Sequence, residues 1–74
     1  MEGLTEGRIV HYVVSEKSGK HRAAIVVNIR DTQNGTCDLF VFSMPQDERG
    51  GFFMVVAKHD DGNSIDTWHW IEKA

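Results

Sequence analysis

Residues 22–43 read RAAIVVNIR-DTQNGT-CDLFVFS and carry the clearest indication of secondary structure in the chain. Two runs rich in β-branched and aromatic residues, Arg22–Arg30 and Cys37–Ser43, flank a polar connection. Within the connection, Asn34-Gly35 is a strong hairpin signal, because a type I′ turn needs positive φ at both central positions. We therefore expect two antiparallel strands joined by a hairpin. The alternation of the first strand is expected to place four side chains on one face: Ala23, Ile25, Val27 and Ile29.

Three further segments have the same β-rich character, and polar, glycine-containing turns separate them. They are Arg8–Val14, Phe52–Lys58 and Asp66–Ile71. The intervening turns are expected at Ser15–Lys20, Met44–Gly51 and His59–Ser64. Residues 1–74 are thus predicted to form a single all-β domain, a small antiparallel five-stranded barrel or strongly bent sheet.

The short chain limits how much of the fold its own core can stabilise. A domain of 74 residues buries only about 60–65% of the surface that its unfolded chain exposes. Cys37 is the only cysteine, so no disulfide forms within the chain, and we interpret it as a small apolar filler. A partner subunit would add buried surface, and a homo-oligomer is therefore predicted.

Charge and hydropathy exclude several classes of partner. A formal net charge of −3 disfavours binding of long nucleic acids, which relies on lysine and arginine at phosphates. A small anionic ligand needs only a few local donors and remains compatible with this charge. The acidic start, Met1–Gly7, is unlike a signal peptide, and no apolar run is long enough to cross a membrane. We expect a cytoplasmic protein that does not bind membranes.

The residue spacing favours neither a metal site nor a catalytic nucleophile. The four histidines His11, His21, His59 and His69 are not at a known ligand spacing. No motif for an activated serine or a phosphate-binding glycine loop is present. The sequence therefore predicts no metal, no cofactor and no catalytic residue, and it favours a binding protein over an enzyme.

Two short segments combine residues that bind anions or stack on bases. Lys20-His21-Arg22 places three donors just before a strand, where they suit a phosphate or carboxylate. Alternatively, this segment is only a solvated strand end. The second segment is Thr67–Trp70, in which the tryptophans share one side and the other two residues share the opposite side.

The tryptophans either face inward as core anchors or leave one ring exposed as a stacking platform for a base. The residues predicted to bind the ligand are Lys20, His21, Arg22, Thr67, Trp68, His69 and Trp70. Of these, Arg22 and His69 are expected to converge on one cleft, either from neighbouring strands or from neighbouring subunits.

Four blocks of the chain, in order, resemble a widespread group of small phage and prophage proteins with the pattern GRIVHYV, HRPAIV, LxVF and TWHWPE. The blocks are Thr5–Val13, Lys20–Val27, Leu39–Phe42 and Thr67–Trp70. Ala23 and Ile71 stand where that group has proline, and neither change removes a polar group. The resemblance implies a phage-encoded protein that acts in the cytoplasm of a bacterial host.

A fainter similarity links Gly7–Val10 and His21–Val26 to the SH3-like barrels of toxin endoribonucleases. That similarity implies an SH3-like barrel, and it implies that Arg22 stabilises a cleaved phosphate. The chain is acidic and lacks the later polar motif of those toxins, so we take the similarity as an indication of topology alone.

Three functions follow from these observations. The favoured one is a binding protein that sequesters a nucleotide-type immune signal of the host. The second is an SH3-like interaction module that docks on a host protein through the acidic side chains Asp47, Glu48, Asp60 and Asp61. The third is a small nuclease or nucleotide hydrolase in which His21 and His69 act as acid and base.

Overall fold

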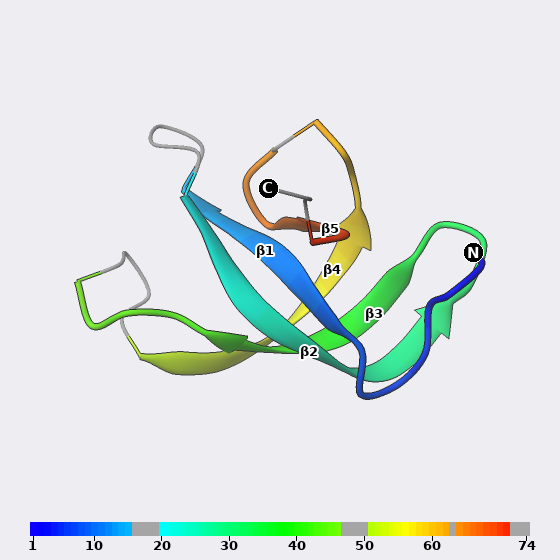
Figure 1. Cartoon of the computed structure of the whole chain (residues 1–74), viewed down its shortest axis with the longest axis horizontal. Helices are drawn as coiled ribbons and strands as arrows, with labels where there is room; N and C mark the ends of the chain where they lie inside the picture. Colours follow the sequence, from blue (N-terminus) through cyan, green and yellow to red (C-terminus); the bar gives the residue numbers. More distant parts are fainter. Residues whose placement is uncertain (16–19, 47–50, 63, 72–74) are drawn as a thin grey trace.

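Five strands form a closed barrel in the order in which they occur along the chain (Figure 1). The computed structural model describes residues 1–15, 20–46, 51–62 and 64–71. The strands are β1 (Ile9–Ser15), β2 (Lys20–Asp31), β3 (Thr36–Phe42), β4 (Phe52–His59) and β5 (Thr67–His69). Each lies within two residues of its predicted ends. Residues 16–19 and 47–50 of the turns predicted at 15–20 and 44–51 lie outside the described residues.

The predicted all-β, five-stranded fold is confirmed, and its size and closure are consistent with an SH3-like barrel. It differs from the expectation at one pairing, because β4 and β5 run parallel whereas the other four pairs are antiparallel. The cause is geometric. Strand directions cannot alternate all the way around a closed ring with an odd number of strands, so one pair must be parallel.

The barrel encloses one apolar core, in which Trp68 is the largest fully buried side chain. Its indole Nε1–H donates a hydrogen bond of 2.7 Å to the carbonyl oxygen of Gly35, so the polar atom of a buried ring is satisfied. Trp70 is half-buried and packs edge-on against Trp68, with 5.1 Å between ring centroids. The core residues are Leu4, Val10, Tyr12, Ala24, Val26, Cys37, Leu39, Val41, Ala57 and Trp68.

A bulge in β2 changes which of its side chains face the core. Ala23 and Val27 are exposed, whereas Ile29 packs against the core, so these three do not share a face as predicted. The register with β3 shifts between Val26 and Asn28. An extra residue in one strand reverses the alternation beyond it, which turns Ile29 inward.

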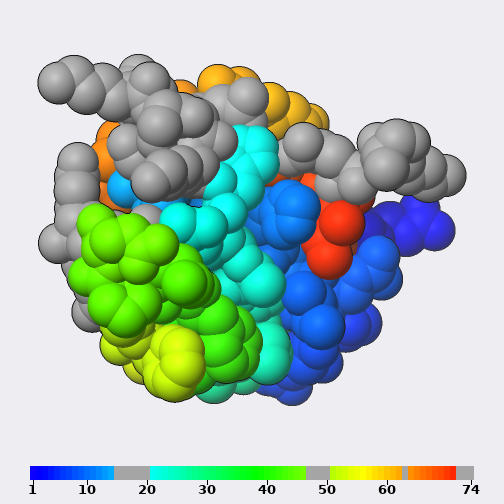
Figure 2. Space-filling view, turned by 60° about the vertical axis from the view of Figure 1, so that its left-hand side comes forward, coloured from blue at the N-terminus to red at the C-terminus, as the bar shows by residue number. Residues whose placement is uncertain are grey.

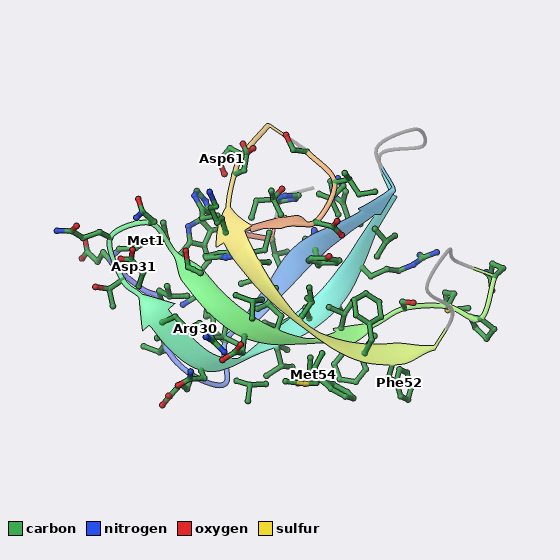
Figure 3. All side chains as sticks on the ribbon, turned by 180° about the vertical axis from the view of Figure 1, so that it is seen from behind. Met1, Arg30, Asp31, Phe52, Met54 and Asp61 are labelled. Carbon is green, nitrogen blue, oxygen red and sulfur yellow. The ribbon has the colours of Figure 1, made fainter. Side chains whose placement is uncertain are left out.

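The β2–β3 hairpin forms as predicted, but its turn is not type I′. The loop spans Thr32–Gly35, and only Gly35 of the central pair has a positive φ, at 70°. The Asp31 carboxylate accepts hydrogen bonds from the backbone N–H groups of Gln33 and Asn34 and from the Asn34 side chain. These bonds stabilise a longer turn and hold the pKa of Asp31 below its usual value. The bond from the Asn34 side chain has the largest effect on that pKa. At the same turn, the amino group of Met1 donates to the Thr32 carbonyl (Figure 3).

The outer face of β3 and β4 is apolar. The rings of Phe40, Phe42 and Phe52 lie 5.1–5.9 Å apart, and Met54 is paired with Phe40. Phe52 and Met54, 68% and 54% exposed, lie on the side of β4 that faces away from β1 (Figure 3). In the described part of the chain, no helix is long and apolar enough to span a membrane. The predicted homo-oligomer stays a prediction.

Cys37 is expected to be unreactive in the folded protein. Its side chain is fully buried, and burial, with a smaller effect of the Asp38 carboxylate, raises the pKa of the thiol to about 11. The thiolate is the reactive form, so modification by a disulfide reagent at neutral pH should require unfolding. The absorbance of the thiolate that the reagent releases should increase along the unfolding transition in urea. Rapid modification of the protein without denaturant would contradict this packing.

Candidate histidine site

Three histidines from three neighbouring strands meet on the outer face of the barrel. His21 belongs to β2, His11 to β1 and His69 to β5, and β1 lies between the other two strands. His11 is directly paired with His69, and His21 is paired with Val13, two residues along β1. Cross-strand and diagonal neighbours on one face of a sheet are within reach of side chains of this length. We call these three residues the histidine cluster.

The imidazole rings of the histidine cluster are in mutual contact. The ring centroids of His21 and His69 are 4.5 Å apart, and those of His11 are 5.8 Å from each. One nitrogen from each ring lies within 4.8 Å of those of the other two. His69 is only 4% exposed, and the other two are half-buried. Among the described residues, the nitrogens are therefore close enough to share one ligand.

The alternation of β1 explains why His11 faces outward. Val10 and Tyr12 belong to the core, so the side chain between them lies on the opposite face. Val13 lies near His21 on the outer face and is fully buried, although it is not part of the core cluster. In Figure 2 the surface of β2 (cyan) adjoins that of β1 (blue), and the end of the described chain (red) lies beyond β1. The histidine cluster thus has a buried apolar neighbour on the outer face of the sheet.

Contacts between β1 and the segment before β5 hold His69 in place. The Tyr12 hydroxyl donates a 2.5 Å hydrogen bond to the Asp66 carboxylate, and the Asp66 backbone N–H donates to the Val13 carbonyl at 3.0 Å. Asp66 has a φ of 66°, a conformation that aspartate tolerates better than most residues. These contacts fix the start of β5, which has only three residues, and they therefore also fix the position of His69.

The predicted residues His21 and His69 are brought together, but Arg22 is not on their face. Tyr12 is paired with Arg22 on one side and with Trp68 on the other, so these three share the inward face. Successive side chains of a strand point to opposite faces, and His21 and Arg22 are successive. A single chain therefore does not form the expected cleft of Arg22 with His69. The side chain of Lys20 lies outside the described residues.

Neither tryptophan offers an open platform for a base. Trp68 is fully buried, which settles its role as a core anchor. Trp70 packs against the core, and the guanidinium of Arg8 lies over its ring, 5.0 Å from the centroid. Thr67 shares the outer face of β5 with His69, and its hydroxyl donates to the Ser64 carbonyl at 2.6 Å.

Thr67 also lines a pocket of about 300 Å³ between the ends of β4 and β5. Lys58, Asp60 and Asp66 line the same pocket, whereas no residue of the histidine cluster does. The main cause of the lowered pKa of Asp60 is a hydrogen bond that its carboxylate accepts from the Gly62 backbone N–H. Asp60, one of the acidic residues suggested for docking, thus has a structural role within its own turn. Two others, Asp47 and Glu48, lie outside the described residues.

His11 is the site residue that the sequence analysis missed. Its signal was the alternation Val10-His11-Tyr12, which places a histidine opposite two apolar side chains. The fourth histidine, His59, is separate from the histidine cluster. Its Nε2 lies 3.2 Å from an Asp61 carboxylate oxygen, and its ring packs on Trp68 with 4.8 Å between centroids. It offers a matched control for substitutions in the cluster.

Imidazoles in contact can donate hydrogen bonds to an anion, exchange protons with a substrate or ligate a metal ion. No protein-family model, curated protein or solved structure matches this chain. The inference of function therefore rests on the geometry of the histidine cluster and on the sequence patterns described above.

Proposed function

We propose that the protein is a small binding protein that captures a phosphate-bearing, nucleotide-like anion at the histidine cluster. The observation that carries the proposal is the contact of His21 with His69, at 4.5 Å between ring centroids. Each belongs to a segment whose residue types suit an anion, and the strand order joins the two segments across β1.

Phosphate oxygens suit this site because imidazole N–H groups are directional donors. A hydrogen bond to a charged group contributes about 1.5–3 kcal/mol, more than one between neutral groups. Partial burial of the cluster, above all of His69, removes competing water. Two or three such donors are sufficient for a small anion in a chain whose net charge is −3.

The proposed biological ligand is a nucleotide-type immune signal of a bacterial host, and the resemblance to phage proteins supports this choice. With Trp68 buried and Arg8 over Trp70, recognition would depend on the phosphates and not on stacking of the base. We therefore expect compounds with the same phosphate group and different bases to bind with similar affinity.

The test is calorimetry with a panel of cyclic dinucleotides, ADP-ribose, ADP and pyrophosphate. His21→Gln and His69→Gln should each raise the dissociation constant about tenfold or more, because each loses a hydrogen bond to a charged group. The matched control His59→Gln should leave it unchanged. Binding of none of these compounds, or equal weakening by the His59 variant, would overturn the proposal.

A second candidate function, phosphodiester hydrolysis, is favoured by the same pair of rings. Two imidazoles in contact can act as base and acid, one accepting a proton from the attacking oxygen and the other donating one to the leaving oxygen. Chromatography of each bound compound after prolonged incubation distinguishes the two functions. Intact ligand supports capture, whereas a product that both histidine variants fail to form supports hydrolysis.

A further inference from the structure

We propose that His11, His21 and His69 together hold a divalent transition-metal ion, with Zn²⁺ as the best-suited ion. The inference rests on the proposed function, because it concerns the same site and identifies the source of the positive charge that would bind the anion. The observation that carries it is that three imidazoles from three different strands present nitrogens within 4.8 Å of one another.

The spacing of the nitrogens is close to that of a zinc site. Zinc binds imidazole nitrogen at about 2.0–2.1 Å with tetrahedral geometry, which puts neighbouring nitrogens about 3.4 Å apart. The nitrogens of the histidine cluster must therefore approach one another by at most about 1.4 Å, a distance within the range of side-chain rotation. The three histidines lie on adjacent, hydrogen-bonded strands, because β1 pairs with both β2 and β5.

The donor set selects the class of ion. Imidazole nitrogens suit zinc, copper, nickel and iron, whereas magnesium and calcium require oxygen ligands. No carboxylate or thiol belongs to this group among the described residues. Three protein ligands also leave a fourth position of a tetrahedral ion open for water or for an anion.

The open position connects the metal to the proposed anion. Arg22, the cation expected beside His69, lies on the other face of the sheet. A divalent ion at the histidine cluster would supply the positive charge that was expected of Arg22, and a phosphate oxygen would occupy its fourth position. The buried neighbour Val13 and the low exposure of His69 restrict competing water.

The experiment titrates metal-free protein with Co²⁺, followed by visible absorption, and with Zn²⁺, followed by calorimetry. We expect one ion per chain and the intense visible bands of four-coordinate cobalt. His11→Gln, His21→Gln and His69→Gln should each weaken binding at least about 100-fold, more than is usual for loss of an outer-shell partner. His59→Gln should not change it. Circular dichroism checks that each variant is folded.

Absence of saturable binding by the folded wild-type protein, or unchanged affinity in a folded variant lacking all three histidines, would overturn the inference. The anion panel is then repeated with metal-free and zinc-loaded protein. Binding of zinc without any anion would support the metal site and overturn the anion-binding function. Binding of an anion by metal-free protein, with no binding of zinc, would support the anion-binding function and overturn the metal site.

Discussion

Replacing Trp68 with alanine is expected to remove a large part of the stability of the barrel. The ring is fully buried, and truncating a buried tryptophan to alanine costs about 3–5 kcal/mol. A chain of this length has roughly 4–11 kcal/mol of stability in total. The midpoint of thermal unfolding should therefore fall by about 12 °C or more. Urea and thermal unfolding followed by circular dichroism measure both quantities.

Two milder variants test how much of this loss comes from the hydrogen bond of Trp68 and how much depends on its full burial. Trp68→Phe retains most of the apolar ring but leaves the carbonyl of Gly35 without its 2.7 Å hydrogen bond, at a cost of about 1–3 kcal/mol. Trp70→Phe, at a half-buried position, should cost only about 1 kcal/mol. Equal effects of Trp68→Ala and Trp70→Ala would contradict the assignment of Trp68 as the principal core anchor.

Gly35→Ala is expected to have the second-largest effect on stability. Gly35 has a φ of 70°, and an added Cβ would lie 2.7 Å from the Cβ of His59, an atom fixed close to the backbone of β4. The left-handed conformation costs a residue with a side chain about 1–2 kcal/mol, and overpacking adds about 1–3 kcal/mol. The free energy of unfolding should thus fall by about 2–5 kcal/mol, as measured in urea.

Gly7→Ala is the matched control for this substitution. Its φ is 88°, but an added Cβ would meet nothing within 4 Å. This variant should lose only the conformational part, about 1–2 kcal/mol. If Gly7→Ala and Gly35→Ala lost the same free energy, the close approach of the hairpin turn to β4 would not be a feature of the folded protein.

The strands could be predicted because local sequence determines where they begin and end. β-branched runs bounded by glycine-containing turns identified all five strands, and Asp31–Thr36 marked the hairpin. The face of Ile29 was not predictable, since it depends on a bulge between Val26 and Asn28 that single-strand alternation does not reveal. The parallel pair of β4 and β5 arises only when the ring closes.

The candidate site was predictable only in part, for a related reason. His21 and His69 were singled out from their neighbours in the sequence, and strand pairing does bring them into contact. Arg22 and Trp68 were singled out with them, but alternation along each strand assigns these two to the inward face. His11 was missed because its partners are distant in sequence, and only the register of β1 between β2 and β5 brings the three rings together.

A nitrogen-15 NMR spectrum of the four histidine side chains, recorded during addition of zinc to one equivalent, shows whether the rings of the histidine cluster form one site. We expect the ring nitrogens of His11, His21 and His69 to shift together and to saturate at one ion per chain, while those of His59 stay unchanged. Separate, non-saturating shifts at all four histidines would show that the three rings do not form a common site.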